Sequence, residues 1–204
     1  MTGKFITFEA NEGAGKTTQI RRLYEKLKEQ GHDVLLTREP GGSPGAEDIR
    51  NLVVQGEAGR WSARTELLLF MAARRDHVER TIQPALEQGK IVLCDRYVGS
   101  TLALQVAGGE SPDFIKKAHD DFIGLWPDHT IYIDISPSTS LARANAVNGA
   151  EDRFESKGSA FHNNVDAAFR EQAKSPSWIR INGEQDISSV ENEIWDKFQK
   201  EILK

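Results

Sequence analysis

The sequence predicts an α/β fold in which a five-stranded parallel sheet carries helices on both faces. Short apolar runs alternate along the 204 residues with longer segments of helical periodicity, an order typical of strand–helix–strand units. Residues 91–94 and 130–135 are continuous apolar runs, as expected for strands covered on both faces. No repeat or linker composition divides the chain, so we expect residues 1–204 to form a single domain.

The first elements follow one another closely. We expect the first strand over residues 4–9 and the first helix over residues 16–30, where Gly31 ends it. A second apolar run predicts a strand over residues 33–37. The carboxyl ends of parallel strands form one edge of a sheet, and ligands bind beyond that edge.

The middle of the chain predicts one long helix and the third strand. Apolar side chains recur at helical spacing over residues 65–88, and Gly89 follows as a stop. The run at residues 91–94 is the third strand. The remaining elements are expected as strands over residues 130–135 and 178–181 and as helices over residues 111–125, 138–146, 160–173 and 187–203.

Charge and cysteine content exclude several classes of protein. The formal net charge is −5 with acidic and basic residues interleaved, which argues against electrostatic binding to nucleic acid or to an anionic membrane. Cys94 is the single cysteine, so no disulfide can form within the chain, and a reducing, cytoplasmic location is expected. The histidines show no metal-ligand spacing.

A phosphate-binding loop lies between the first strand and the first helix. Residues 10–17 read Ala-Asn-Glu-Gly-Ala-Gly-Lys-Thr, which matches the P-loop spacing except that Ala10 replaces the first glycine. Glycines let backbone N–H groups face phosphate oxygens, and the helix N-terminus favours negative charge. These features predict a P-loop NTPase fold. The expected ATP-binding residues of the loop are Glu12, Gly13, Ala14, Gly15, Lys16, Thr17 and Thr18.

A Mg²⁺ ion is expected beside this loop. The Thr17 hydroxyl can ligate the metal while Lys16 reaches the β- and γ-phosphates. Asp95 follows the third apolar run, where a second, acidic metal ligand would lie. A GTPase would need a guanine-reading Asn-Lys-x-Asp segment, and the sequence has none.

Three further segments carry a family resemblance. Residues 37–42 read Thr-Arg-Glu-Pro-Gly-Gly, residues 69–75 read Leu-Phe-Met-Ala-Ala-Arg-Arg, and residues 95–101 read Asp-Arg-Tyr-Val-Gly-Ser-Thr. With the P-loop they make the chain resemble the thymidylate kinases, P-loop enzymes that convert dTMP to dTDP with MgATP. The resemblance runs from about residue 5 to about residue 182. It implies a dTMP kinase that acts as a homodimer.

The resemblance also implies an acceptor site. Arg38 and Arg96 follow adjacent strands, and both guanidinium groups could fork onto the acceptor phosphate. Phe70 would stack on the pyrimidine and Arg74, one helical turn later, would hydrogen-bond its exocyclic oxygen. The other implied acceptor contacts are Glu12 at the sugar 3′-hydroxyl, Thr101 and Gln105 at the base edge, and Arg50 at the rim.

A short mobile lid is expected over about residues 143–157. Residues 152–155 read Asp-Arg-Phe-Glu and resemble the family's lid pattern. Arg153 is expected to neutralise the transferring phosphoryl group, and Arg143 to contact the adenine or its phosphates. The P-loop carries no basic residue at Asn11 or Glu12, so the chain resembles the bacterial-type branch, in which lid arginines supply this charge.

Several positions depart from the family pattern. Asn145 and Val147 stand where relatives carry lid arginines, and Leu104 stands where a tyrosine is common. Asp166 and Phe169 occupy places where arginine and tyrosine are frequent. A kinase for another or a modified pyrimidine monophosphate therefore remains an alternative.

The residues alone leave two more hypotheses open. A deoxynucleoside kinase would need a carboxylate base after the second strand, a role open to Glu39. The paired arginines Arg38 and Arg96 favour an acceptor that is already phosphorylated. A nucleotide-binding module without turnover is the last hypothesis, suggested by the arginine-poor lid together with Ala10.

Overall fold

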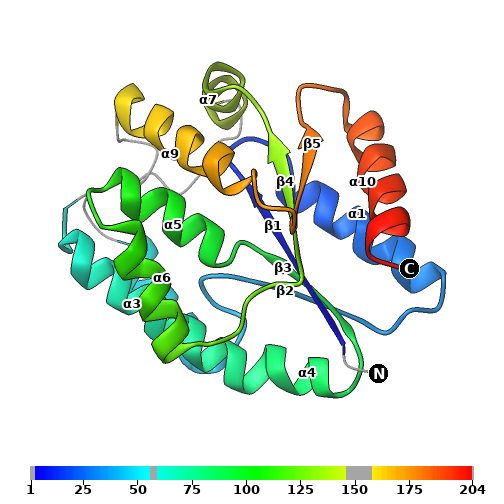
Figure 1. The fold of residues 1–204 in the computed structure, drawn as a ribbon, viewed down its shortest axis with the longest axis horizontal. Helices are drawn as coiled ribbons and strands as arrows, with labels where there is room; N and C mark the ends of the chain where they lie inside the picture. The colour runs from blue at the N-terminus through cyan, green and yellow to red at the C-terminus, as the bar shows by residue number, and fades with distance from the viewer. Residues whose placement is uncertain (1–2, 56–58, 146–157, 204) are drawn as a thin grey trace.

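The computed structural model describes residues 3–55, 59–145 and 158–203. Its core is a five-stranded sheet in the order β2-β3-β1-β4-β5, in which all neighbouring strands are parallel. This confirms the predicted α/β class and sheet (Figure 1). The strands are β1 (Lys4–Ala10), β2 (Val34–Arg38), β3 (Ile91–Asp95), β4 (His129–Asp134) and β5 (Trp178–Asn182).

Helices cover both faces of the sheet (Figure 1). On one face α1 and α10 pack against the strands, and on the other face lie α3 to α6 and α9. The helical elements are α1 (Lys16–Glu29), α2 (Pro44–Val54), α3 (Ala63–His77), the π-helical turn η1 (Val78–Ile82), α4 (Gln83–Glu87), α5 (Val98–Ala107), α6 (Pro112–Phe122), α7 (Pro137–Asn145), α9 (Ser159–Gln172) and α10 (Ile187–Glu201). Within the described ranges no helix combines the length and apolarity needed to cross a bilayer.

Alternation along β1 explains how one strand serves two cores. Ile6 and Phe8 belong to the cluster formed with α1 and α10, while Phe5 belongs to the cluster on the opposite face. Successive side chains of a strand point to opposite faces, so both sides of β1 are buried. Glu9 lies on the same side as Phe5, next to α5, and is fully buried there.

The sequence-based expectation did not include helices α2 and α5. The segment that forms α2 begins Ser-Pro-Gly and the segment that forms α5 begins Val-Gly-Ser-Thr, compositions typical of turns. In the structure Pro44 occupies the first turn of α2, where its missing N–H costs nothing. Helix α5 is buried along most of its length, so packing outweighs its weak intrinsic preference.

The long helix expected over residues 65–88 is divided. Helix α3 ends at His77, the π-helical turn η1 follows, and α4 completes the segment. Pro84 has no N–H to donate, so an unbroken ladder of α-helical hydrogen bonds cannot pass through this position. Apolar periodicity does not distinguish these helix types, and the sequence therefore predicted one element.

The strand ends place the functional segments at one edge of the sheet. Arg38 lies opposite Asp95 in the β2–β3 pair, and Phe8 lies opposite Asp95 in the β1–β3 pair. The loop after β1, the segment after β2 and the turn after β3 therefore meet at the carboxyl edge, where parallel sheets bind ligands.

Candidate active site

The loop between β1 and α1 has the backbone geometry of a phosphate cradle. Gly13 and Gly15 have φ angles of 70° and 79°, in the left-handed region that residues with a Cβ rarely adopt. Gly15 is also the N-cap residue of α1. The loop therefore turns backbone N–H groups and the positive end of α1 toward the same point, which suits a polyphosphate.

Ala10 fits the first position of this motif because it still belongs to β1. Its backbone is extended, and its methyl group is fully buried in the core cluster beneath α1. No left-handed conformation is needed here, so alanine imposes no restriction on the loop that follows.

Lys16, Thr17 and Asp95 converge beside the loop. The Lys16 ammonium group forms an ion pair with Asp95, and the Thr17 hydroxyl donates a 2.8 Å hydrogen bond to the Oδ2 atom of Asp95. Burial lowers the pKa of Lys16, and the charge of Arg96 adds to this effect. Burial would raise the pKa of Asp95, but Lys16, Arg96 and Thr17 outweigh it and hold this pKa below its usual value. The side chains expected at the γ-phosphate and the metal thus lie together.

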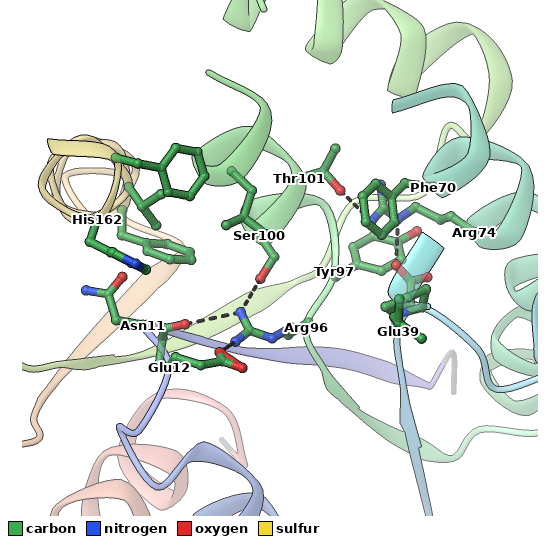
Figure 2. A pocket seen from close by; sticks show the side chains of 17 residues that line it. Asn11, Glu12, Glu39, Phe70, Arg74, Arg96, Tyr97, Ser100, Thr101 and His162 are labelled. Carbon is green, nitrogen blue, oxygen red and sulfur yellow. Dashed lines mark hydrogen bonds and ion pairs between the residues drawn. The ribbon is translucent and has the colours of Figure 1, made fainter. Parts of the chain in front are cut away.

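Arg96 is oriented by a left-handed turn after β3. Its φ of 68° is uncommon for a residue other than glycine. The guanidinium pairs with Glu12 and donates to the Ala10 carbonyl at 3.2 Å and to the Ser100 hydroxyl at 2.9 Å (Figure 2). The Arg96 charge is the main reason that the pKa of Glu12 is lowered. Arg96 is therefore held directly against the P-loop.

Glu9 supports this turn from below and was not predicted from the sequence. Its Oε1 atom accepts hydrogen bonds from the Tyr97 and Ser100 N–H groups at 2.9 and 3.0 Å, and its Oε2 atom accepts from the Ser100 hydroxyl at 2.5 Å. Burial raises the pKa of Glu9. A Cβ at Gly99 would lie 2.8 Å from the carboxylate, so only glycine allows this close approach.

Arg38 lies at the exposed end of β2. Its Nη2 atom lies 3.0 Å from Glu47 Oε2, and its Nη1 atom donates to the Pro40 carbonyl at 2.9 Å. Arg50 donates to the same carbonyl at 2.8 Å. The Arg38 side chain is 46% exposed, so its guanidinium is accessible to a ligand.

One cavity of about 500 Å³ contacts both the P-loop and the arginines predicted at the acceptor phosphate and at the rim. It is bounded by the whole loop from Asn11 to Thr18, by Asp95, and by Arg38, Arg50, Arg96 and Arg143. A volume of this size is in the usual range for a small-molecule site. The arrangement brings a site for a triphosphate and a group of guanidiniums to the same hollow.

A second, smaller cavity adjoins the first and is lined mainly by apolar side chains. Both cavities share Asn11, Glu12, Glu39, Pro40 and Arg96. Figure 2 shows the Phe70 ring and the Arg74 side chain on one side of this cavity and His162 on the other. Apolar walls with a few polar groups are typical of a pocket for a flat heterocycle.

Arg74 is almost fully buried, at 3% exposed, and its guanidinium is held on three sides. The Nε atom donates to Glu39 Oε2 at 2.7 Å, the Nη2 atom donates to the Thr101 hydroxyl at 2.9 Å, and the group lies 4.8 Å from the centre of the Tyr97 ring. The Nη1 atom has no hydrogen-bond partner among the residues that the structure describes. Within the described part of the chain, the Nη1 group of Arg74 is thus unpaired beside the second cavity, which the Arg74 side chain lines.

Two of the predicted site residues are not placed at a cavity by the structure. Gln105 is buried away from both cavities, and its amide donates to Glu66 Oε2 at 2.9 Å. Arg153 lies outside the described residues, as does most of the expected lid. Arg143, on α7, lines the first cavity and donates to the Gly183 carbonyl at 3.0 Å.

The positions that depart from the family pattern are connected to the site. Leu104 lines the second cavity. Asp166 accepts a 3.1 Å hydrogen bond from the Asn11 amide and a 2.8 Å hydrogen bond from Arg170. Asp166 therefore ties helix α9 to the P-loop, a role that its position in the sequence did not reveal. Asn145 and Val147 fall where the structure describes no side chain.

Comparisons with known proteins identify the family of the chain. A family model described as thymidylate kinase matches residues 8–194. A thymidylate kinase of Ruegeria pomeroyi is 48% identical over 192 residues, which cover 93% of this chain and 91% of that protein. One from Caulobacter vibrioides is 54% identical over 174 residues, which cover 84% of this chain and 83% of that protein.

The fold has a match among solved structures as well. The crystal structure of thymidylate kinase from Ehrlichia chaffeensis superposes with a TM-score of 0.78 at 34% identity. That match covers 98% of this chain and 99% of the other. The family model and both relatives span most of the chain. The chain therefore belongs to the thymidylate kinase family.

Proposed function

We propose that this chain transfers the γ-phosphoryl group of ATP to dTMP through the cavity between the P-loop and the paired arginines. Membership of the family makes it a nucleoside monophosphate kinase that forms dTDP. The observation that carries the assignment of sites is that Lys16, Arg38 and Arg96 line one cavity. Such a cavity can hold donor and acceptor phosphates in line.

The P-loop binds the donor in this proposal. Its N–H groups hold the phosphates, and Lys16 neutralises charge on the β- and γ-phosphoryl oxygens. Thr17 and Asp95 fit a Mg²⁺ ion, because their oxygens already lie 2.8 Å apart and oxygen is the ligand that Mg²⁺ prefers. When bound, Mg²⁺ would neutralise phosphate charge.

The acceptor phosphate lies in the cavity that the P-loop also lines, and the base lies in the adjoining cavity. Arg38 and Arg96 bind its phosphate, Glu12 accepts from the sugar 3′-hydroxyl, and Arg50 lies at the rim. Phe70 stacks on the thymine, and the Nη1 atom of Arg74, which no described residue engages, donates to an exocyclic oxygen. We keep Thr101 as a contact at the base edge, although its hydroxyl already accepts from Arg74. Gln105 stays a prediction from the resemblance alone.

Arginines neutralise the remaining negative charge of the transferring phosphoryl group in this proposal. Arg96 lies against the P-loop, and Arg143 lines the donor side of the cavity. Arg153 keeps the role implied by the resemblance. An arginine on the transferring group contributes a factor of about 10³–10⁵ in well-studied phosphoryl transfer enzymes.

A deoxynucleoside kinase fits the site less well. Its base would be Glu39, yet both carboxylate oxygens of Glu39 are already bonded, to Arg74 at 2.7 Å and to His77 at 3.1 Å. A carboxylate committed to a buried arginine is poorly suited to accept a proton from a substrate hydroxyl.

An assay of ADP release over a panel of acceptors tests the proposal. The panel contains dTMP, dUMP, dCMP, UMP and unphosphorylated thymidine at one MgATP concentration. We expect turnover with dTMP and none with thymidine. Turnover with thymidine but not with dTMP would overturn the assignment of Arg38 and Arg96, and efficient use of UMP would show that Leu104 does not exclude the 2′-hydroxyl.

We also propose that each chain is a single kinase domain, and that two chains form a homodimer in the cytoplasm. Large apolar side chains are exposed on α3, on α6 and just after it, and these helices pack together. They are Leu68, Phe114, Phe122 and Trp126. A patch of this kind is typical of a protein–protein interface. Light scattering during gel filtration is expected to give twice the mass of one chain, and a monomeric mass would contradict the proposal.

A further inference from the structure

Three ionisable side chains form a buried cluster at the base-binding cavity, where Glu39 and Arg74 are part of the wall. Glu39, Arg74 and His77 are 6%, 3% and 0% exposed. Of these three, the proposed function uses Arg74 alone. Charged groups are costly to bury unless they are paired and hydrogen-bonded, so a cluster of this kind beside a cavity calls for a specific account.

The cluster is a continuous chain of hydrogen bonds that ends at Arg74. Thr37 Oγ1 lies 2.7 Å from His77 Nε2, His77 Nδ1 lies 3.1 Å from Glu39 Oε1, and Arg74 Nε donates to Glu39 Oε2 at 2.7 Å. A carboxylate that is paired with arginine only accepts, so Nδ1 must be the protonated nitrogen of His77. In a neutral imidazole with this tautomer, Nε2 accepts from the Thr37 hydroxyl. Each of these three hydrogen bonds then has one donor and one acceptor, so the direction of donation is fixed from Thr37 to His77 and from His77 to Glu39.

Neighbouring backbone leaves the side chains of this hydrogen-bonded series little room to move. A Cβ at Gly42 would lie 2.3 Å from His77 Nε2 and 2.6 Å from Thr37 Oγ1, so the loop backbone closes directly over the imidazole. Thr81 of η1 in turn donates to the Gly42 carbonyl at 2.8 Å. The π-helical turn η1, which follows His77 directly, is thus also joined to the loop after β2.

We propose that Glu39 and His77 are positioning residues that set the base specificity of the acceptor site by fixing the orientation of Arg74. With Nε on Glu39 and Nη2 on Thr101, Nη1 is the guanidinium nitrogen that no described residue engages, so its N–H groups are available to the base. This inference rests on the proposed function. It places Nη1 against position 4 of the pyrimidine, where thymine has an oxygen acceptor and cytosine has an amino donor.

A donor that cannot rotate distinguishes these two bases. An amino group facing the fixed Nη1 atom leaves two donors unpaired in a buried site, which is strongly unfavourable. A guanidinium released from Glu39 can turn away or tilt, and the penalty for cytosine then falls. The chain of hydrogen bonds from Thr37 to Arg74 therefore acts on selectivity more than on the chemical step.

The test compares kcat and KM for dTMP and dCMP in the wild type and in Glu39→Gln and His77→Phe variants. We expect KM for dTMP to rise about 10-fold, kcat and KM for ATP to stay within about 3-fold, and the dTMP/dCMP ratio of kcat/KM to fall about 10-fold. His77→Asn keeps an amide N–H near the Nδ1 position and is expected to recover part of the ratio that His77→Phe loses.

A matched control separates positioning from simple loss of stability. His119 is also 0% exposed, but it bonds the Leu125 carbonyl at 2.8 Å and lines neither cavity. His119→Asn is expected to lower the melting temperature and to leave the dTMP/dCMP ratio unchanged. Thr37→Val changes the first member of the hydrogen-bonded series without changing its shape, and it serves as the test if the other variants fail to fold. The dTMP/dCMP ratio of kcat/KM is then expected to fall about 3-fold.

The outcomes distinguish this inference from the proposed function. A wild-type protein that does not turn over dTMP contradicts the function itself. A wild type that is active on dTMP, together with folded Glu39, His77 and Thr37 variants that all keep the wild-type ratio, overturns the positioning role. A ratio that falls equally in His119→Asn also overturns it.

Discussion

Lys16 joins the P-loop to the carboxylate at the end of β3. Its ammonium group is buried and paired with Asp95, and burial lowers its pKa. Lysine reaches the β- and γ-phosphates only from this position, because the loop before it and the helix after it fix its backbone. The charge that it supplies is part of transition-state stabilisation in phosphoryl transfer.

The first prediction concerns Lys16→Ala. We expect kcat with dTMP and ATP to fall by at least about 10²-fold, the scale of losing one preorganised electrostatic contact. Lys28→Ala, at an exposed position on the same helix, is the matched control and is expected to keep wild-type rates. Transfer at the wild-type rate by Lys16→Ala would rule out the P-loop mechanism.

The second prediction concerns His119 and pH. Burial lowers the pKa of His119 to about 4 from a usual 6.5. The unfolded chain therefore binds a proton below pH 6.5 that the folded chain does not bind until about pH 4, and stability is lost as pH falls through this window. For one such group the free energy of unfolding should drop by about 2 kcal/mol between pH 7 and pH 5.

Urea unfolding at both pH values measures this effect. His119→Asn is expected to be less stable than the wild type at pH 7 but to lose less stability on going to pH 5. An equal loss in the two proteins would show that His119 does not cause the acid dependence.

Some residues of the site could be predicted from the sequence and others could not. The P-loop residues from Glu12 to Thr18 were predictable because they are consecutive and their spacing reflects one physical requirement. Glu9, Glu39 and His77 were not assigned these structural roles, because their partners lie far along the chain and only the fold brings them together. Gln105 matched the family pattern, yet its side chain bonds Glu66 instead of lining a cavity.

Helix α9 is coupled to the P-loop through Asp166. Asp166 accepts from Asn11 and from Arg170, and Arg170 also pairs with Asp134 at 2.9 Å at the end of β4. The network joins the loop after β1, the end of β4 and the helix that follows the expected lid. Arg170, one helical turn after Asp166, supplies the cation of this network.

The third prediction tests this element. Asp166→Ala leaves the buried Asn11 amide without its partner, so we expect the free energy of unfolding to fall by about 1–3 kcal/mol. Asn164→Ala, at an exposed position on the same helix, is the control and should change stability by less than about 0.5 kcal/mol. Equal stability of the two variants would show that the contact contributes nothing.

Elements were predicted well where one apolar face determines them. All five strands coincide with apolar runs of the sequence. Their apolar side chains are packed in the core, so the runs themselves mark the strands. Helices α2 and α5 were missed because residues such as Pro44 and Gly99 signal turns locally, while their helical state depends on packing and on the N-terminal position of the proline.

At the scale of the whole molecule, the sheet determines which segments meet. The order β2-β3-β1-β4-β5 places the strands that carry Arg38, Asp95 and the P-loop next to one another. The sequence predicted a parallel sheet and the segments at its edge, but distances between side chains required the structure. The central claim is that the phosphates of both substrates meet in one cavity, so that the phosphoryl group passes directly between them.

The stereochemical course of transfer tests that claim most directly. ATP made chiral at the γ-phosphorus with oxygen isotopes or sulfur would be reacted with dTMP, and the configuration of the transferred group would be determined in dTDP. A single in-line displacement between substrates that face each other predicts inversion at phosphorus. Retention would contradict the account, because it requires two successive transfers through an intermediate on the protein.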